Sequence, residues 1–108
     1  DLGRNLDEAE RLIQAAMKHK PDDGYITDSL GWVYYKKGQY DKAVHYLLEA
    51  VRLVPDDPVI LEHLGDAYLK LNDRPNALKY YRRALEKTDS DTADLEEKIR
   101  SLGEDVTP

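Results

Sequence analysis

The segment LGWVYYK at residues 30–36 is repeated as LGDAYLK at residues 64–70, and the two segments begin 34 positions apart. Leucine, glycine, tyrosine and lysine recur at the same places within both. Self-similarity at a fixed period of about 20–50 residues is the signature of repeat architectures, in which each unit is a supersecondary element that stacks on its neighbours. The two segments therefore predict a chain built from tandem repeats.

The same period extends in both directions from this segment. Pro21 and Pro55 close two of the units, and Asp89 stands where a third proline is expected. Small residues in a repeated slot allow neighbouring helices to approach closely. Such slots recur in three units, at Ala9, Ala43 and Ala77 and at Ala16, Ala50 and Ala84, beside a large apolar slot at Ile13, Leu47 and Tyr81.

Apolar residues within each unit follow helical spacing. Ile26, Leu30 and Val33 form one such stripe, which is typical of a half-buried helix. Gly38 lies between the first and second predicted helices of one repeat, and Asn72 lies between those of the next. Glycine and asparagine best tolerate the left-handed conformation that ends a helix. Short turns of this kind predict antiparallel hairpins. The predicted helices span about residues 6–19, 24–37, 41–54, 58–71, 75–88 and 92–101.

We expect a single domain over residues 1–108, because a chain of this length suits one small domain. Its start matches only the second helix of a repeat, so we expect a fragment of a longer protein. Leu95, Ile99 and Leu102 form one narrow apolar stripe, as a capping helix requires. The expected parts are a truncated repeat at 6–21, full repeats at 24–55 and 58–89, a capping helix at 92–102 and a loose tail at 103–108.

Composition argues against two classes of partner. Asp and Glu outnumber Lys and Arg by 22 to 16, which gives a formal net charge of −6. Phosphate backbones and anionic membranes repel such a chain unless basic residues gather on one face, and the sequence has no basic stripe. No apolar run approaches the roughly 20 residues of a membrane helix. We therefore expect a soluble protein without nucleic-acid binding or membrane insertion; its lack of cysteine fits cytoplasm and periplasm equally.

The sequence lacks the residue patterns of catalytic and cofactor sites. His19, His45 and His63 lie on three different predicted helices, without the spacing of metal ligands. The pairs at residues 22–23 and 56–57, both Asp-Asp, follow a proline and precede a helix, where negative charge stabilises the helix start. Neither a glycine-rich phosphate loop nor a nucleophilic serine elbow occurs. We therefore expect no enzyme activity, no metal site and no cofactor.

These repeats resemble the tetratricopeptide repeat family, whose 34-residue pattern places Trp, Leu-Gly, Tyr, Ala, Phe and Pro at fixed positions. Thr27 and Leu61 stand where the family usually has tryptophan. The resemblance implies an all-α fold, a right-handed α-solenoid of antiparallel helix hairpins with a C-terminal capping helix. The order of motifs is also similar to the C-terminal part of long bacterial proteins of this family. The match reads Leu30-Gly31, Tyr34, Ala43, Leu47, Ala50 and Pro55, then Leu64-Gly65, Tyr68, Ala77, Tyr81 and Ala84.

The resemblance also implies that the first helix of each hairpin lines a concave, peptide-binding groove. Periodicity agrees, because Asp28, Trp32 and Tyr35 lie on the side of their helix opposite the apolar stripe. Aromatic side chains outside a core are candidate anchors, although Trp32 has the alternative of packing against a neighbouring hairpin. The predicted groove residues are Tyr25, Asp28, Ser29, Trp32, Tyr35 and Lys36, then Val59, Glu62, His63, Asp66, Leu69 and Lys70.

The leading functional hypothesis is a non-catalytic scaffold that binds a peptide or protein segment in this groove. Asp28, Glu62 and Asp66 make the predicted groove acidic, which favours a neutral or basic partner. The alternative hypothesis is self-association, because the helix at 6–19 lacks the first helix of its hairpin. Its apolar side is then open to pairing with a second copy of the chain.

Overall fold

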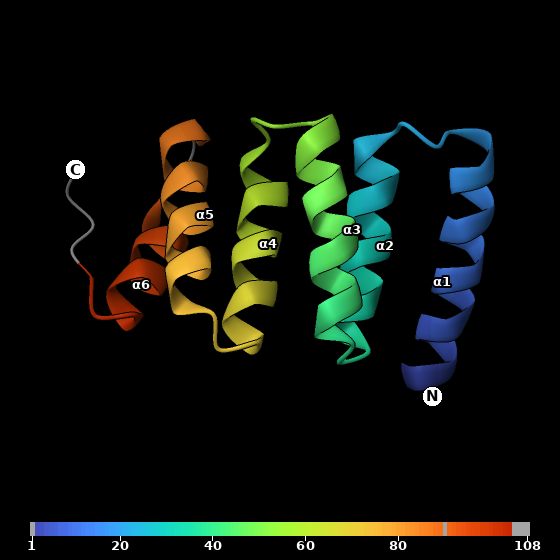
Figure 1. The fold of residues 1–108 in the computed structure, drawn as a ribbon, viewed down its shortest axis with the longest axis horizontal. Coiled ribbons are helices and arrows are strands. Elements are labelled where there is room, and N and C mark those ends of the chain that lie inside the picture. Colours follow the sequence, from blue (N-terminus) through green and yellow to red (C-terminus); the bar gives the residue numbers. More distant parts are fainter. Residues whose placement is uncertain (1, 90, 105–108) are drawn as a thin grey trace. The chain divides into compact units, whose positions relative to one another are not determined.

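The computed structural model describes residues 2–89 and 91–104, and these residues form six α-helices and no strand (Figure 1). This confirms the predicted all-α helical repeat. Five helices agree with their predicted bounds to within one residue, whereas the first begins earlier, because residues 2–5 contain no proline. The helices are α1 (Leu2–His19), α2 (Gly24–Lys36), α3 (Tyr40–Leu53), α4 (Pro58–Lys70), α5 (Arg74–Lys87) and α6 (Ala93–Ser101).

The helices belong to two compact units, residues 1–55 and 56–108. In the first unit, α2 packs against α3, and α1 packs against α2. In the second unit, α4 packs against α5, and α5 packs against α6. Figure 1 shows α2 with α3, and α4 with α5, as antiparallel pairs, which confirms the predicted hairpins. The predicted tail lies outside the described residues from residue 105 onward.

Aspartates cap the starts of α2, α4 and α5, and a glycine or an asparagine follows the ends of α2, α4 and α6. The Asp23 carboxylate accepts hydrogen bonds from the N–H groups of residues 25 and 26, and Asp57 does the same for residues 59 and 60. The Asp-Asp pairs are thus helix starts, as expected. Gly38, Asn72 and Gly103 have positive φ angles of 79°, 60° and 81° just after α2, α4 and α6. These left-handed residues end the helices and fix the short turns.

The two hairpins share one packing device, a glycine in the first helix facing a large side chain in the second. A Cβ atom added to Gly31 lies 2.7 Å from Cγ of Leu47, and one added to Gly65 lies 2.6 Å from Cε1 of Tyr81. Neither separation is tolerated by real atoms, so only glycine permits this approach without a shift. The four repeated alanines of α3 and α5 complete these interfaces with no exposed surface; they are Ala43, Ala50, Ala77 and Ala84.

Candidate functional site

The exposed side of α2 carries the first set of predicted groove residues, and we call Tyr25, Asp28, Ser29, Trp32, Tyr35 and Lys36 the α2 face. The opposite side of α2 is buried in its hairpin. Asp28, Trp32 and Tyr35 are each half-buried, while Ser29 and Lys36 are exposed. The amphipathic spacing therefore places a tryptophan and a tyrosine outside the main core, with part of each ring accessible to solvent.

Aromatic stacking orders the centre of the α2 face. The Trp32 and Tyr35 rings are nearly parallel, with centroids 4.3 Å apart and an interplanar angle of 5°. Lys36 Nζ lies 5.7 Å from the centroid of the Trp32 ring, within cation–π range. Tyr40, at the start of α3, meets Tyr35 edge-on with centroids 5.5 Å apart. Trp32 thus packs against its own helix and remains partly exposed, and Tyr40 is a member of the cluster that sequence periodicity missed.

Tyr25 and Ser29 extend the α2 face toward the start of the helix. Tyr25 is 58% exposed, which is high for an aromatic side chain. A surface hollow of about 570 Å³ lies beside it, lined by the loop before α2 and by Val54. The Ser29 hydroxyl donates a 3.0 Å hydrogen bond to the Tyr25 carbonyl oxygen. This end of the face offers one large, open aromatic surface.

A lysine of α6 pairs with both carboxylates of the second predicted set. We call this set the α4 face, and its members are Val59, Glu62, His63, Asp66, Leu69 and Lys70. Lys98 Nζ lies 2.6 Å from Glu62 Oε2 and 3.0 Å from Asp66 Oδ1. The Tyr81 hydroxyl donates a 2.5 Å hydrogen bond to the same Asp66 oxygen. Burial opposes the charge of Lys98, but the hydrogen bonds to the two carboxylates outweigh it and raise the pKa of the lysine.

This pairing changes the charge expected of the α4 face. Glu62 and Asp66 are balanced by Lys98 and by the exposed Lys70. The sequence-based expectation of an acidic surface omitted Lys98, which lies on the predicted cap. His63 and Leu69 are half-buried, and Val59 is 56% exposed. The α4 face is thus close to electrically neutral, and its two carboxylates serve to attach α6.

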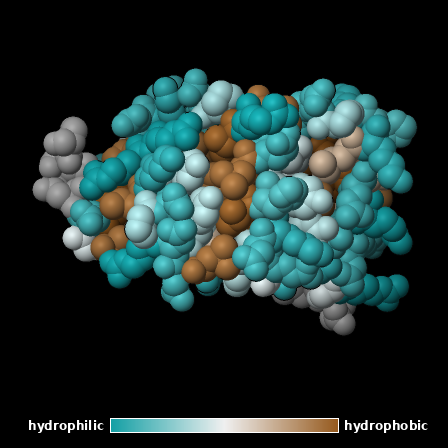
Figure 2. Space-filling view, viewed as in Figure 1, coloured by the Kyte–Doolittle hydropathy of each residue, from teal (hydrophilic) through white to brown (hydrophobic). Residues whose placement is uncertain are grey.

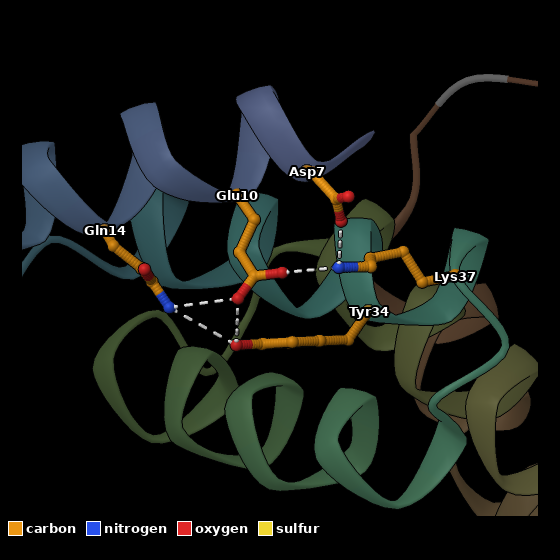
Figure 3. A network of polar contacts seen from close by, with 5 residues as sticks. All are labelled: Asp7, Glu10, Gln14, Tyr34 and Lys37. Atoms are coloured by element: carbon orange, nitrogen blue, oxygen red, sulfur yellow. Dashed lines mark hydrogen bonds and ion pairs between the residues drawn. The ribbon is translucent and has the colours of Figure 1, made fainter. Parts of the chain in front are cut away.

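A polar network joins α1 to α2 on another side of the first unit (Figure 3). Lys37 Nζ lies 2.6 Å from Asp7 Oδ1 and 2.8 Å from Glu10 Oε1. The Tyr34 hydroxyl donates a 2.9 Å hydrogen bond to Glu10 Oε2, and Gln14 donates to the same oxygen at 3.2 Å. Glu10 is the centre of the network because both of its oxygens accept hydrogen bonds. None of these residues was among the predicted site residues.

Protonation of Glu10 is expected to weaken this network when the pH falls below the ordinary pKa of a glutamate. The hydrogen bond from Lys37 lowers the pKa of Glu10, while burial partly opposes the shift, so the charged form favours the folded state. The pKa of Lys37 is raised, chiefly by its hydrogen bond to Asp7. Stability from Glu10 is therefore present above about pH 4.3 and lost as the pH falls through its lowered pKa. Lys37 stays charged throughout this range, so its own titration changes the stability only at alkaline pH.

Glu10→Gln is the variant that tests this pH dependence. We expect it to lower the free energy of unfolding by roughly 0.5–1 kcal/mol at neutral pH, and by less at an acidic pH below the ordinary pKa of a glutamate, because Glu10 loses its charge in the parent chain too as the pH falls through its lowered pKa. Urea unfolding followed by circular dichroism at both pH values measures this. Glu8→Gln is the control, because Glu8 pairs with Arg11 at 4.0 Å on the exposed surface. An equal loss for Glu10→Gln at both pH values contradicts the assignment.

Hydrophilic residues cover most of the side shown in Figure 2, with apolar side chains visible between them. Among the residues that the structure describes, no three His, Cys, Asp or Glu side chains are grouped so that they could hold a metal ion. In the same part of the chain, none of the helices combines the length and the apolar character needed to cross a membrane. The large apolar side chains with most exposure are Leu12, Tyr25, Leu48, Val59 and Leu71.

Comparison with known proteins places this arrangement in a family. The sequence profile of the tetratricopeptide repeat matches residues 2–58 and again residues 29–92. No curated protein matches the sequence. Among solved structures, the first tetratricopeptide domain of Spaghetti (RPAP3), bound to the HSP90 peptide SRMEEVD, superposes with a TM-score of 0.86 at 20% identity. That match covers 94% of this chain and 79% of the other.

Two bacterial structures are also similar. The type III secretion translocator chaperone SycD of Yersinia enterocolitica has a TM-score of 0.87 at 17% identity, covering 94% of this chain and 74% of that one. A thermophilic repeat protein of Thermus thermophilus has a TM-score of 0.79 at 31% identity, covering 90% of this chain but only 49% of its own. Low identities show the fold alone, whereas the profile matches cover most of the sequence. The chain belongs to the tetratricopeptide repeat family.

Proposed function

We propose that this chain is a non-catalytic interaction module that holds a segment of another protein, with the α2 face as its anchor. The main support for this proposal is the stack of Trp32 and Tyr35. Their rings are nearly parallel with centroids 4.3 Å apart, and both side chains are still partly exposed. A preordered aromatic surface loses little side-chain entropy when it binds, and Trp and Tyr are the residues most enriched at binding hot spots. The α4 face is a second, weaker contact surface.

The fold comparisons support this proposal at the level of the class of function. The Spaghetti domain was solved with a bound peptide, so the same arrangement of helices is able to hold one. Its identity to this chain is only 20%, so its contacts with the peptide do not identify the residues of this chain that would contact a partner. Here the α2 face combines two stacked rings with Asp28 and Lys36, one charge of each sign.

Charge on the two faces favours a neutral partner segment over a strongly basic one. Lys36 already lies over the Trp32 ring, where a basic side chain of a partner would compete with it. Glu62 and Asp66 are paired with Lys98 and are not available without breaking that contact. A partner segment of low net charge with an apolar or aromatic side chain meets neither obstacle. Shape and apolar area then decide the affinity, and electrostatic steering contributes little.

Trp32→Ala is expected to weaken binding by about tenfold or more, because it removes the largest ring of the α2 face. Peptides can be selected by display of a random library on the immobilised chain and then measured by fluorescence anisotropy with a label on the peptide. The label is placed on the peptide because Trp32 is the only tryptophan, so the Trp32→Ala variant has no tryptophan fluorescence with which to follow binding. We expect the selected sequences to be rich in apolar and aromatic residues and low in net charge.

Leu71→Ala is the matched control for this measurement, because Leu71 is exposed but lies outside the α2 face. It should leave the affinity of the selected peptides unchanged, and circular dichroism should show that all variants remain helical. Tyr35→Ala should weaken binding as well, since it removes the ring that orders Trp32. Selected peptides that bind the Trp32→Ala and Tyr35→Ala variants as tightly as the parent chain would contradict the anchor.

A further inference from the structure

Tyr25 and Trp32 lie on the same side of α2, two helical turns apart. They are separated by seven positions of one helix, which returns a side chain to nearly the same direction. With a rise of about 1.5 Å per residue, their Cα atoms are separated by about 10.5 Å along the helix axis. A bound segment that contacts both aromatic residues therefore needs two apolar side chains on one side of its own backbone at about this separation.

The Tyr25 end of this surface has room for a compact apolar group. Tyr25 is 58% exposed and borders the hollow of about 570 Å³, to which Pro21 and Val54 add apolar surface. Gly24 brings the end of α3 close to the start of α2, because a Cβ atom added to Gly24 lies only 2.4 Å from Cγ2 of Val54. The hollow and the Tyr25 ring together form a second contact point, distinct from the stack of Trp32 on Tyr35.

The regular backbone conformations differ in whether they provide this separation. In an extended strand, side chains on one side are two or four residues apart, at about 7 Å or about 13 Å. In a polyproline II helix, which has about three residues per turn, side chains three residues apart lie on one side, about 9.3 Å from each other. In an α-helix, residues seven positions apart match the separation as well. A segment bound along α2 thus fits as polyproline II or as an α-helix.

The centre of the α2 face favours polyproline II over an α-helix. Asp28 and Ser29 lie between Tyr25 and Trp32, where the middle of the continuous apolar stripe of a docked helix would fall. A polyproline II backbone has no internal hydrogen bonds, so its N–H groups are able to donate to side-chain oxygens. The Ser29 hydroxyl donates its hydrogen to the Tyr25 carbonyl oxygen, and a hydroxyl oxygen also accepts hydrogen bonds. These polar side chains suit an open backbone better than an apolar helix.

We propose that the segment held on the α2 face is proline-rich and in the polyproline II conformation, with prolines three residues apart that contact Tyr25 and Trp32. Proline fixes φ near about −65°, so such a segment loses little conformational entropy on binding. Aromatic-lined surfaces are the usual receptors for this conformation. Proline is uncharged, which suits a face where Asp28 and Lys36 supply one charge of each sign. The inference rests on the proposed function and specifies the chemistry of the partner.

Two labelled twelve-residue peptides of identical composition test the spacing. The first is four repeats of Pro-Ala-Gln, with prolines three residues apart, and the second is PAPQQAPAPQQA, in which no two prolines have that separation. Fluorescence anisotropy should show binding of the first peptide with a dissociation constant below about 1 mM. The second should bind about fivefold more weakly, because only one of its prolines reaches an aromatic contact point at a time.

Variants of Tyr25 locate the second contact point. Tyr25→Ala should weaken binding of the first peptide by about fivefold and remove the difference between the two peptides, since Trp32 alone cannot distinguish their spacing. Tyr25→Phe keeps the ring and should bind like the parent chain. Leu48→Ala is the control, because Leu48 is 39% exposed on α3 and lies outside the α2 face. Circular dichroism should show that all three variants remain helical.

Equal affinity of the two peptides, or undiminished binding of the first peptide to Tyr25→Ala, overturns the inference. A helical peptide with leucines seven positions apart that binds more tightly than the first peptide overturns it too. The inference fails alone if peptides selected from the random library depend on Trp32 while neither proline peptide binds below about 1 mM. The proposed function fails with it if the selected peptides bind Trp32→Ala and Tyr35→Ala as tightly as the parent chain.

Discussion

Tyr81→Ala is expected to lower the free energy of unfolding by about 3–5 kcal/mol, the range for truncating a large buried aromatic residue. Tyr81 has no exposed surface and is one of the largest fully buried side chains. Its ring lies directly against Gly65, which has no side chain to move into the space. The cavity therefore stays open, and the loss includes both the lost apolar burial and the cavity itself. Urea unfolding followed by circular dichroism measures the change.

Tyr81→Phe separates the ring from its hydroxyl. This variant keeps the packing against Gly65 and loses only the hydrogen bond to Asp66, so we expect a loss of about 1–2 kcal/mol. Asp66 retains Lys98 as a partner, which keeps the loss in the lower part of that range. If Tyr81→Ala costs no more than Tyr81→Phe, the contact between the ring and Gly65 does not stabilise the second unit.

The repeat made most of the fold predictable. A glycine or alanine that recurs every 34 residues beside a large apolar residue indicates closely packed helices. The close approach of Leu47 to Gly31 agrees with this predicted packing. Gly38 and Asn72 were expected to end helices by their backbone freedom, and both have positive φ. The start of α1 was harder to predict, because the chain before residue 6 has neither a stop signal nor a repeated residue.

The candidate site was less predictable, because its contacts do not repeat. Lys98 stands 34 residues after Leu64, in a slot where Leu30 and Leu64 are buried. The earlier residues of this slot are apolar, so the repeat does not indicate the ion pairs that Lys98 makes with Glu62 and Asp66 of α4. Tyr40 was missed for a similar reason: its contact with Tyr35 crosses a turn, which helical periodicity does not describe. Interactions between side chains of different helices depend on how the helices pack in three dimensions, which the spacing of residues in the sequence does not give.

The same ion pair leads to the second large expected effect. Lys98→Glu should lower the free energy of unfolding by about 2–3 kcal/mol, because it replaces a charge-assisted contact by three neighbouring carboxylates. The side chains of Lys98, Glu62 and Asp66 are 35%, 27% and 14% exposed, so solvent screens part of the repulsion. We expect α6 to detach first, seen as faster hydrogen exchange of its amides than of those of α5.

Charge reversal elsewhere on α6 distinguishes this role from a general effect of net charge. Arg100 lies on the same short helix, is 55% exposed and pairs loosely with Glu96 at 3.4 Å, so Arg100→Glu should cost less than about 1 kcal/mol. Adding Glu62→Lys to Lys98→Glu restores one pair of opposite charges and should recover about half of the loss. Equal costs for Lys98→Glu and Arg100→Glu would show that apolar burial of Leu95 and Ile99 alone holds α6 in place. The α4 carboxylates would then be open to a basic partner, and the preference for a neutral segment would have to be abandoned.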